Sequence, residues 1–299
     1  MRAVINKYPT PLIVILSIAL GFFLPQVGLV WKPYLTILLM LLTFFVTLNI
    51  EPSEIARSMK NYPVIAMSLA TVFVLTPLLS IPAKPFFSTI VYAGTVLALC
   101  CPSAIATAFW AKVFKGDVAT ALVISTITNL LSIATIPATM LILAGTSVNV
   151  DTMNMMTNLG EIVLIPIMAS FLLRKFVRID WNRVSSYTSR IELPILVLLV
   201  WGSIAPGVEY ARNNIIEFAF LNAFMFGTLA LAFILTHLLT RRFGYKKATS
   251  IEIATTVKNA ALSLVIGLST FGPQILPPLI ANLIAQNLLL VPAKALTKE

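Results

Sequence analysis

The chain has 299 residues, of which 59% are hydrophobic and 11% charged, and its 21 Lys and Arg against 11 Asp and Glu give a net charge of +10. Soluble globular proteins are about 45–50% apolar and about 25% charged, so this composition excludes an ordinary soluble domain and a disordered chain. With two cysteines, a disulfide-stabilised secreted domain is excluded as well. We therefore expect an integral membrane protein in a lipid bilayer, and we attribute the basic excess to membrane topology and not to nucleic acid binding.

Ten apolar stretches follow one another along the chain, and a helix needs about 20 residues to cross the hydrocarbon of a bilayer. Five spans in each half would orient two related halves oppositely, as in the inverted repeats of many secondary transporters. We therefore predict an all-α polytopic membrane protein with ten transmembrane helices and two five-helix repeats, residues 1–150 and 151–299. The predicted spans are 10–30, 33–50, 62–81, 88–112, 117–144, 157–177, 191–208, 214–240, 247–271 and 276–296.

The basic residues divide unevenly between the two sides of these spans. The side that holds both termini and every even-numbered connection collects 17 of them, whereas the other side holds only Lys32, Lys84 and Arg212. Basic residues are concentrated in cytoplasmic connections. We therefore predict a multi-pass protein of the plasma (inner) membrane with both termini in the cytoplasm. Lys258 belongs to neither side.

The fourth span contains a proline in its middle, in the sequence Cys100-Cys101-Pro102-Ser103. A proline inside a helix removes a backbone hydrogen bond and clashes with the preceding turn. Two interpretations remain open, a simple kink or an unwound segment that lines a functional cavity. In the second interpretation Ser103 and Thr107 belong to a binding site.

The ninth span carries polar and charged residues within a stretch of membrane-spanning length: Glu252, Thr255, Thr256, Lys258 and Asn259. Lys258 follows Lys247 by about 11 residues, which corresponds to about 16 Å of helix and places it near the bilayer midplane. A charge at that depth is costly and usually functional. We therefore predict that Lys258 is an internal site residue, whereas Glu252 also suits a position at the membrane surface.

Two interrupted helices that cross at the midplane would direct helix ends toward one another, and such ends bind ions and small anions. The fifth and tenth spans add the polar residues Ser125, Thr128, Asn129 and Gln286, each of which could instead make only helix–helix hydrogen bonds. No metalloprotease, phosphate-loop, serine-hydrolase or Cys/His metal motif is found. We therefore expect neither an enzyme nor a bound cofactor.

The pattern resembles the bile acid:sodium symporter superfamily, in its bacterial and archaeal type. The resemblance rests on residues 31–36, on Cys100-Cys101-Pro102, on Lys115-Gly116-Asp117 and on the Glu-containing ninth span. It implies a panel domain of helices 1, 2, 6 and 7 and a core domain of helices 3–5 and 8–10, with helices 4 and 9 crossing at the site. It also implies alternating access, usually with two sodium ions and an organic anion.

The sodium ligands of that family are poorly preserved here. Glu252 lies two residues before the family's glutamate position, about 200° around a helix. A site that loses neutral oxygen ligands and gains a lysine no longer suits sodium, and a compact ammonium can take the place of a cation. We therefore predict that Lys258 replaces at least one sodium ion. The family's ligand positions fall on Val72, Thr107, Ala108, Ala121, Ser125, Ala254, Lys258 and Asn259.

These observations predict a secondary active transporter of a small organic anion that is proton-coupled or independent of sodium, without an obligate protein partner. One alternative is sodium-coupled symport of an organic anion. Another is an arsenite-type efflux permease that uses Cys100 or Cys101, which otherwise serve as small buried side chains. A membrane enzyme is disfavoured because no catalytic motif is found. A sensor is disfavoured because no output domain is found.

Overall fold

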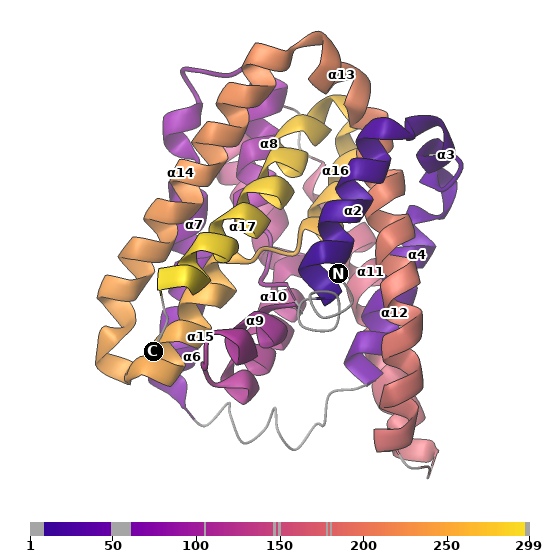
Figure 1. Cartoon of the computed structure of the whole chain (residues 1–299), viewed down its shortest axis with the longest axis vertical. Coiled ribbons are helices and arrows are strands. Elements are labelled where there is room, and N and C mark those ends of the chain that lie inside the picture. Colours follow the sequence, from indigo (N-terminus) through magenta and orange to yellow (C-terminus); the bar gives the residue numbers. More distant parts are fainter. Residues whose placement is uncertain are drawn as a thin grey trace.

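The computed structural model describes residues 9–48, 61–104, 106–145, 148, 151–177, 179 and 181–296, without the side chains of 9–12, 182, 183, 185, 186, 189 and 291–296. Helices make up nearly all of this part of the chain (Figure 1). Within it, extended pairing is limited to one isolated bridge. The predicted repeat boundary at residue 150 lies outside the described residues, as do the basic side chains of Arg2, Lys7, Arg57, Lys60, Arg178, Arg183, Lys294 and Lys298.

The helices of the first half follow the predicted spans closely. Asp117 begins the long helix α10, because its side chain accepts a hydrogen bond from the Thr120 amide at 3.1 Å and so caps the first turn. The helices of this half are α2 (Pro9–Phe23), α3 (Pro25–Leu29), α4 (Leu35–Leu48), α6 (Tyr62–Ala70), α7 (Thr76–Leu78), α8 (Thr89–Cys100), α9 (Thr107–Val113) and α10 (Val118–Ala144).

In the second half, two helices begin earlier than predicted. Asp151 caps α11 through the Asn154 amide at 3.0 Å, and α12 already begins at Trp181, ten residues before the predicted seventh span. The polar first turns of α12 hid this start from a search for apolar residues. The helices are α11 (Thr152–Phe176), α12 (Trp181–Ile204), α13 (Val208–Asn213), α14 (Ile215–Thr240), α15 (Tyr245–Thr256), α16 (Ala260–Phe271) and α17 (Leu276–Leu296).

Several of these helices suit a bilayer. Among the described residues, five helical segments are long and apolar enough to cross a membrane, and four shorter helices are also apolar. Large apolar side chains such as Phe23, Ile142 and Ile216 point outward, as expected for surfaces that contact lipid. The molecule is thus a multi-pass helical membrane protein. The ten-span count, the inverted repeat and the cytoplasmic termini stay predictions.

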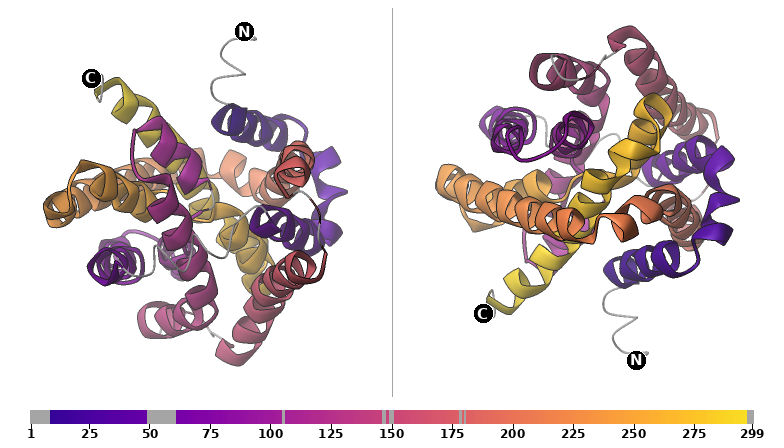
Figure 2. Two further views of the ribbon diagram at one scale, coloured as in Figure 1. Left: turned by 90° about the horizontal axis from the view of Figure 1, so that it is seen from below. Right: turned by 90° about the horizontal axis from the view of Figure 1, so that it is seen from above.

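The core lies around α8, α16 and α17. Residues 91–100 of α8 are all buried, and Gly94 lets this helix approach the start of α17 so closely that an added Cβ would lie 2.5 Å from the Pro278 ring. On one side of the molecule α12 packs against α2 and α4, and α4 also packs against α11. Figure 2 shows α2, α4 and α12 on this side, opposite α6 and α14.

Both spans that were predicted to be discontinuous are interrupted. Residues 101–106 separate α8 from α9, and residues 257–259 separate α15 from α16. This confirms the unwound segment over the simple proline kink at Pro102. The third span contains a further irregularity that we did not predict, a π-helical turn over Thr71–Leu75 (η2) between α6 and α7. Such turns are rare and are often found at functional sites.

Candidate functional site at the crossing of two interrupted helices

The two interruptions lie against each other and pair through their backbones. Ser103 and Lys258 form an antiparallel bridge. The Ala104 amide donates to the Val257 carbonyl at 2.9 Å, and the Asn259 amide donates to the Pro102 carbonyl at 2.8 Å. Backbone groups in a membrane need partners inside the protein. The pairing therefore gives the Ala104 and Asn259 amides partners at the point where both helices open.

Lys258 is fully buried at this crossing. Its Nζ donates to the Val72 carbonyl at 3.1 Å and to Thr76 Oγ1 at 2.7 Å. Its backbone amide donates to Gln286 Oε1 at 2.9 Å, which joins α17 to the crossing. A buried charge is tolerated only when hydrogen bonds satisfy it. The π-helical turn, which includes Val72, and the Thr76 hydroxyl beside it supply those acceptors.

A second hydrogen-bond network surrounds the Ser103 carbonyl. Asn129 Nδ2 donates to it at 2.9 Å and Ser125 Oγ at 3.2 Å. Asn259 Nδ2 donates to Asn129 Oδ1 at 2.9 Å, which links the two interrupted spans through α10. The Ser103 amide and hydroxyl contact Thr128 Oγ1 and Thr107 Oγ1, at 3.2 and 2.8 Å. Six of the predicted residues therefore meet in one network: Ser103, Thr107, Ser125, Thr128, Asn129 and Asn259.

Glu252, Thr255 and Thr256 occupy α15, and their side chains make hydrogen bonds outside the network around Ser103. The Glu252 carboxylate contacts His237 Nδ1 at 3.0 Å; this glutamate side chain is 7% exposed and the histidine 58%. Thr255 Oγ1 donates to Thr71 Oγ1 at 2.8 Å in the π-helical turn. Thr256 Oγ1 donates to the Glu252 carbonyl at 2.8 Å. Glu252 thus pairs with α14 and not with the Lys258 ammonium.

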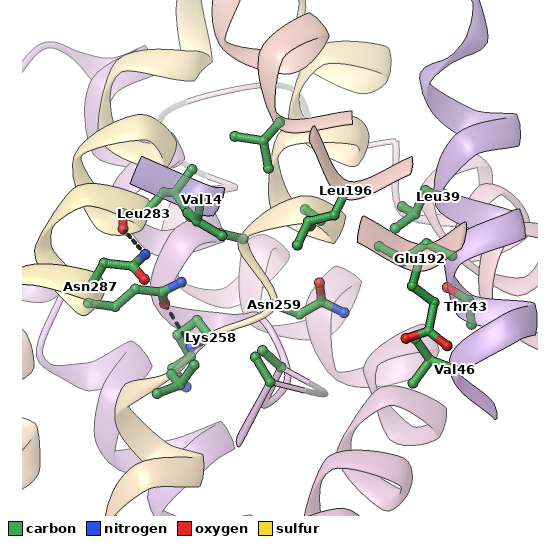
Figure 3. Close-up of a pocket in the computed structure, with 18 of the residues that line it drawn as sticks. Val14, Leu39, Thr43, Val46, Glu192, Leu196, Lys258, Asn259, Leu283 and Asn287 are labelled. Atoms are coloured by element: carbon green, nitrogen blue, oxygen red, sulfur yellow. Dashed lines mark hydrogen bonds between the residues drawn. The ribbon is translucent and has the colours of Figure 1, made fainter. Parts of the chain in front are cut away.

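A cavity of about 280 Å³ adjoins the crossing (Figure 3). One wall consists of residues 257–261, α9 and α17, and the other consists of α2, α4 and α12. Apolar side chains line most of it. The polar lining residues are Thr43, Glu192, Lys258, Asn259, Gln286 and Asn287. Cys100 and Cys101 are buried and do not line this cavity.

Sequence reasoning missed two contributors to the site, Thr76 and Glu192, and it treated Val72 only as a family ligand position whose side chain is lost. The Thr76 hydroxyl carries no sequence signal, because threonine is common in membrane helices, and the Val72 backbone carbonyl contributes although its side chain cannot. Glu192, on the opposite wall, carried a weaker signal: it is an acidic residue at the edge of the predicted span 191–208, whereas Lys258 lies near the middle of its predicted span.

Comparisons with known proteins find similarity along almost the whole chain. The model of the SBF-like CPA transporter family matches residues 9–297. An uncharacterized Pseudomonas aeruginosa protein, PA2026, is 24% identical over 89% of this chain and 86% of its own length. The uncharacterized sodium-dependent transporter YocS of Bacillus subtilis is 22% identical over 87% and 81%. The probable chloroplastic sodium/metabolite cotransporter BASS2 of Oryza sativa subsp. japonica is 24% identical over 87% of this chain and 63% of its own.

The family match spans nearly the whole chain, so it covers the interrupted helices and the cavity together. The relatives with informative names are transporters. The protein is thus a membrane transporter of the sodium/bile acid symporter type. It belongs to the SBF-like CPA transporter family, within the bile acid:sodium symporter superfamily.

Proposed function

We propose that this protein is a secondary active transporter of a small organic anion, and that the Lys258 ammonium takes the place of a sodium ion. Transport would then be proton-coupled or independent of sodium. One observation carries the proposal: the fully buried Nζ lies 3.1 Å from the Val72 carbonyl and 2.7 Å from Thr76 Oγ1, at the crossing of the interrupted helices. Carbonyl and hydroxyl oxygens of this kind would otherwise suit a small cation.

The residues at the crossing do not fit sodium. The Val72 carbonyl and Thr76 Oγ1 already accept hydrogen bonds from the ammonium. The Ser103 carbonyl already accepts from Asn129 and Ser125. A sodium ion near the first pair of oxygens would be repelled by Lys258, and one near Ser103 would have to displace two donors. These oxygens at the crossing therefore already have hydrogen-bond donors from the chain itself.

The cavity has the properties that a small organic ligand requires. Its lining is largely apolar with a few polar groups, the usual composition of small-molecule sites. Ala260 and Ala261, at the start of α16, lie on its wall, and the N-terminus of a helix favours negative charge. Gln286 uses its Oε1 to accept from Lys258, so its amide nitrogen stays a donor. These groups support an anionic end of the ligand on this wall.

The arrangement of helices supports alternating access. The cavity lies between the interrupted helices and the group formed by α2, α4 and α12. Movement of one group of helices relative to the other would open the cavity to either side of the membrane in turn, as in other transporters with discontinuous helices. The bound ligand would contact both groups and so respond to their relative position.

Sodium-coupled symport is the second candidate. It is favoured by the names of two relatives, a sodium-dependent transporter and a sodium/metabolite cotransporter. Lys258 and its hydrogen bonds argue against it in this chain. Transport measurements decide between the two candidates.

The test is uptake of a panel of labelled organic anions into proteoliposomes, with sodium and pH gradients imposed separately. We expect uptake by the natural protein to persist when potassium replaces sodium. Lys258→Gln should abolish it, whereas Lys112→Gln, at an exposed position of α9, should not. Uptake that requires a sodium gradient would refute sodium independence, and unchanged uptake by Lys258→Gln would refute the role of the ammonium.

A further inference from the structure

Four basic residues gather where α14 ends and α15 begins. Two of them belong to the short turn η5 (Arg241–Phe243) and two to the first turn of α15. Figure 1 shows α14 and α15 meeting at one end of the molecule. Three of the four side chains are exposed and the fourth is half-buried. This basic patch consists of Arg241, Arg242, Lys246 and Lys247.

The basic patch has no acidic counterpart among the residues that the structure describes. None of its side chains forms an ion pair there. Two acidic residues of neighbouring segments are engaged elsewhere. The Glu252 carboxylate contacts His237 at 3.0 Å, and the Asp117 carboxylate accepts a hydrogen bond from the Thr120 amide at 3.1 Å. The charge at this corner is therefore positive and accessible to an anion.

An apolar stripe on α14 leads directly to the basic patch. It consists of Leu231, Ile234 and Leu238, which are 44%, 55% and 53% exposed. Residues at this spacing share one face of a helix, and the same spacing continues to Arg241 and Arg242. In a membrane protein an exposed apolar face of this kind contacts acyl chains. One face of α14 thus combines a surface for hydrocarbon with a cationic end.

A ligand that suits both features has a phosphate group at one end and hydrocarbon at the other. Arginine and lysine bind phosphate oxygens well, arginine through paired hydrogen bonds. Clusters of about four to eight basic residues beside a transmembrane helix recognise anionic lipids. Tyr245, inside the cluster, is 59% exposed, and tyrosine is enriched where a membrane meets water. A soluble phosphate would use the basic patch and leave the apolar stripe without a partner.

We propose that the basic patch binds the headgroup of an anionic phospholipid, whose acyl chains lie along the apolar stripe of α14. This site is separate from the cavity, because none of the four basic residues lines it. The bound lipid would hold the start of α15 at the membrane surface, and α15 leads to the interruption at residues 257–259.

The first interrupted span is attached to the same corner. The Asp117 amide, which follows α9, donates to the Lys246 carbonyl at 3.0 Å. The Tyr245 hydroxyl donates to the Phe114 carbonyl, at the end of α9, also at 3.0 Å. A lipid bound at the basic patch would therefore anchor the surface ends of both interrupted spans.

The test is thermal unfolding of the purified protein in detergent, titrated with phosphatidylglycerol or with phosphatidylcholine that has the same acyl chains. Glycerol 1-phosphate provides the phosphate without the chains. We expect phosphatidylglycerol to stabilise the natural protein at about tenfold or more lower concentration than phosphatidylcholine, as the attraction of several basic residues predicts. The preference should weaken in about 1 M salt, which screens exposed charges. Glycerol 1-phosphate should have little effect.

The double variant Arg241→Gln and Arg242→Gln should lose most of the preference for phosphatidylglycerol. Replacing the same two residues by lysine keeps the charge and should retain most of it. The control variant Lys175→Gln and Arg190→Gln removes two exposed charges from α11 and α12 and should behave like the natural protein. If the glutamine variant of the basic patch fails to fold, the lipid series on the natural protein still decides the question.

Four outcomes would overturn the inference. Phosphatidylcholine could stabilise the natural protein as well as phosphatidylglycerol does, or the glutamine variant of the basic patch could keep the preference. Glycerol 1-phosphate could reproduce the stabilisation, which would indicate a site for soluble phosphate compounds. The control variant could lose the preference as fully as the patch variant, which would indicate a response to net charge alone. Because the measurement follows lipid binding and not uptake, none of these results bears on the proposed function.

Discussion

From the hydrogen bonds of Lys258 we predict different effects on the free energy of unfolding for substitutions at two residues in contact. Thr76→Val replaces a hydroxyl by a methyl group and removes the closer acceptor of the ammonium, 2.7 Å away, while the charge stays buried. Lys258→Met removes the charge and keeps most of the side-chain volume. If Lys258 acts through its charge, the two substitutions should have different effects on stability from those expected if it acts only through the packing of its methylene chain.

The magnitudes follow from the two contacts. Hydrogen bonds to charged groups contribute about 1.5–3 kcal/mol each and neutral ones about 0.5–1.5 kcal/mol. Thr95 offers a control, because its hydroxyl is also buried but donates only to the Val91 carbonyl, whereas Thr76 Oγ1 donates to the Val72 and Leu99 carbonyls, at 2.8 and 3.0 Å, besides accepting from the ammonium. Thr76→Val should therefore lower the free energy of unfolding by about 1–2 kcal/mol more than Thr95→Val does.

Lys258→Met should change the free energy of unfolding by less than about 2 kcal/mol, because the lost hydrogen bonds are offset by the ammonium's desolvation penalty of several kcal/mol. It should nevertheless abolish transport. In the Lys258→Met background, Thr76→Val should cost about 1–2 kcal/mol less than in the natural protein, the coupling of a directly contacting pair.

The assay is denaturant titration of the purified protein in detergent, followed by tryptophan fluorescence, for the two single variants, the double variant and the Thr95→Val control. Three results would refute the reasoning. Thr76→Val could cost no more than Thr95→Val, the two substitutions could act additively, or Lys258→Met could unfold the protein outright. The last result would mean that the lysine serves chiefly to hold the helices together.

Three further predictions concern packing and hydrogen bonding near the site. Gly94→Ala should destabilise the protein by about 1–3 kcal/mol in the denaturant titration, because the added methyl group clashes with α17. Gly160→Ala has open space and should be neutral or stabilising in the same titration. Asn129→Ala should cost about 2 kcal/mol or more and slow transport, because it breaks the link between both interrupted spans; unchanged uptake would contradict this. His237→Ala should cost about 1–3 kcal/mol by leaving the buried Glu252 carboxylate without this partner, and adding Glu252→Gln should restore much of the loss in a denaturant titration.

The composition of the chain was enough to determine its class, and two particular residues were enough to locate its central feature, the pair of interrupted helices. An apolar content of 59% can be accommodated only in lipid, so a multi-pass helical protein follows directly. Pro102 lacks an amide hydrogen and disfavours a helix at the residue before it. Lys258 is too costly to face lipid. These are local effects, and they located both helix interruptions within a few residues.

Only the tertiary structure decided which groups meet at the crossing. The acceptors of the Lys258 ammonium lie 182 and 186 residues away in the chain. One of them is the carbonyl of Val72, in a π-helical turn that no residue pattern predicted. Glu252, which the sequence placed at the site, is instead held by His237, whereas Glu192 reaches the cavity from the other group of helices. The periodicity of a helix depends on residues that are close together in the chain. The register between distant helices depends instead on how all their side chains pack together, and that packing decides which oxygens surround a buried charge.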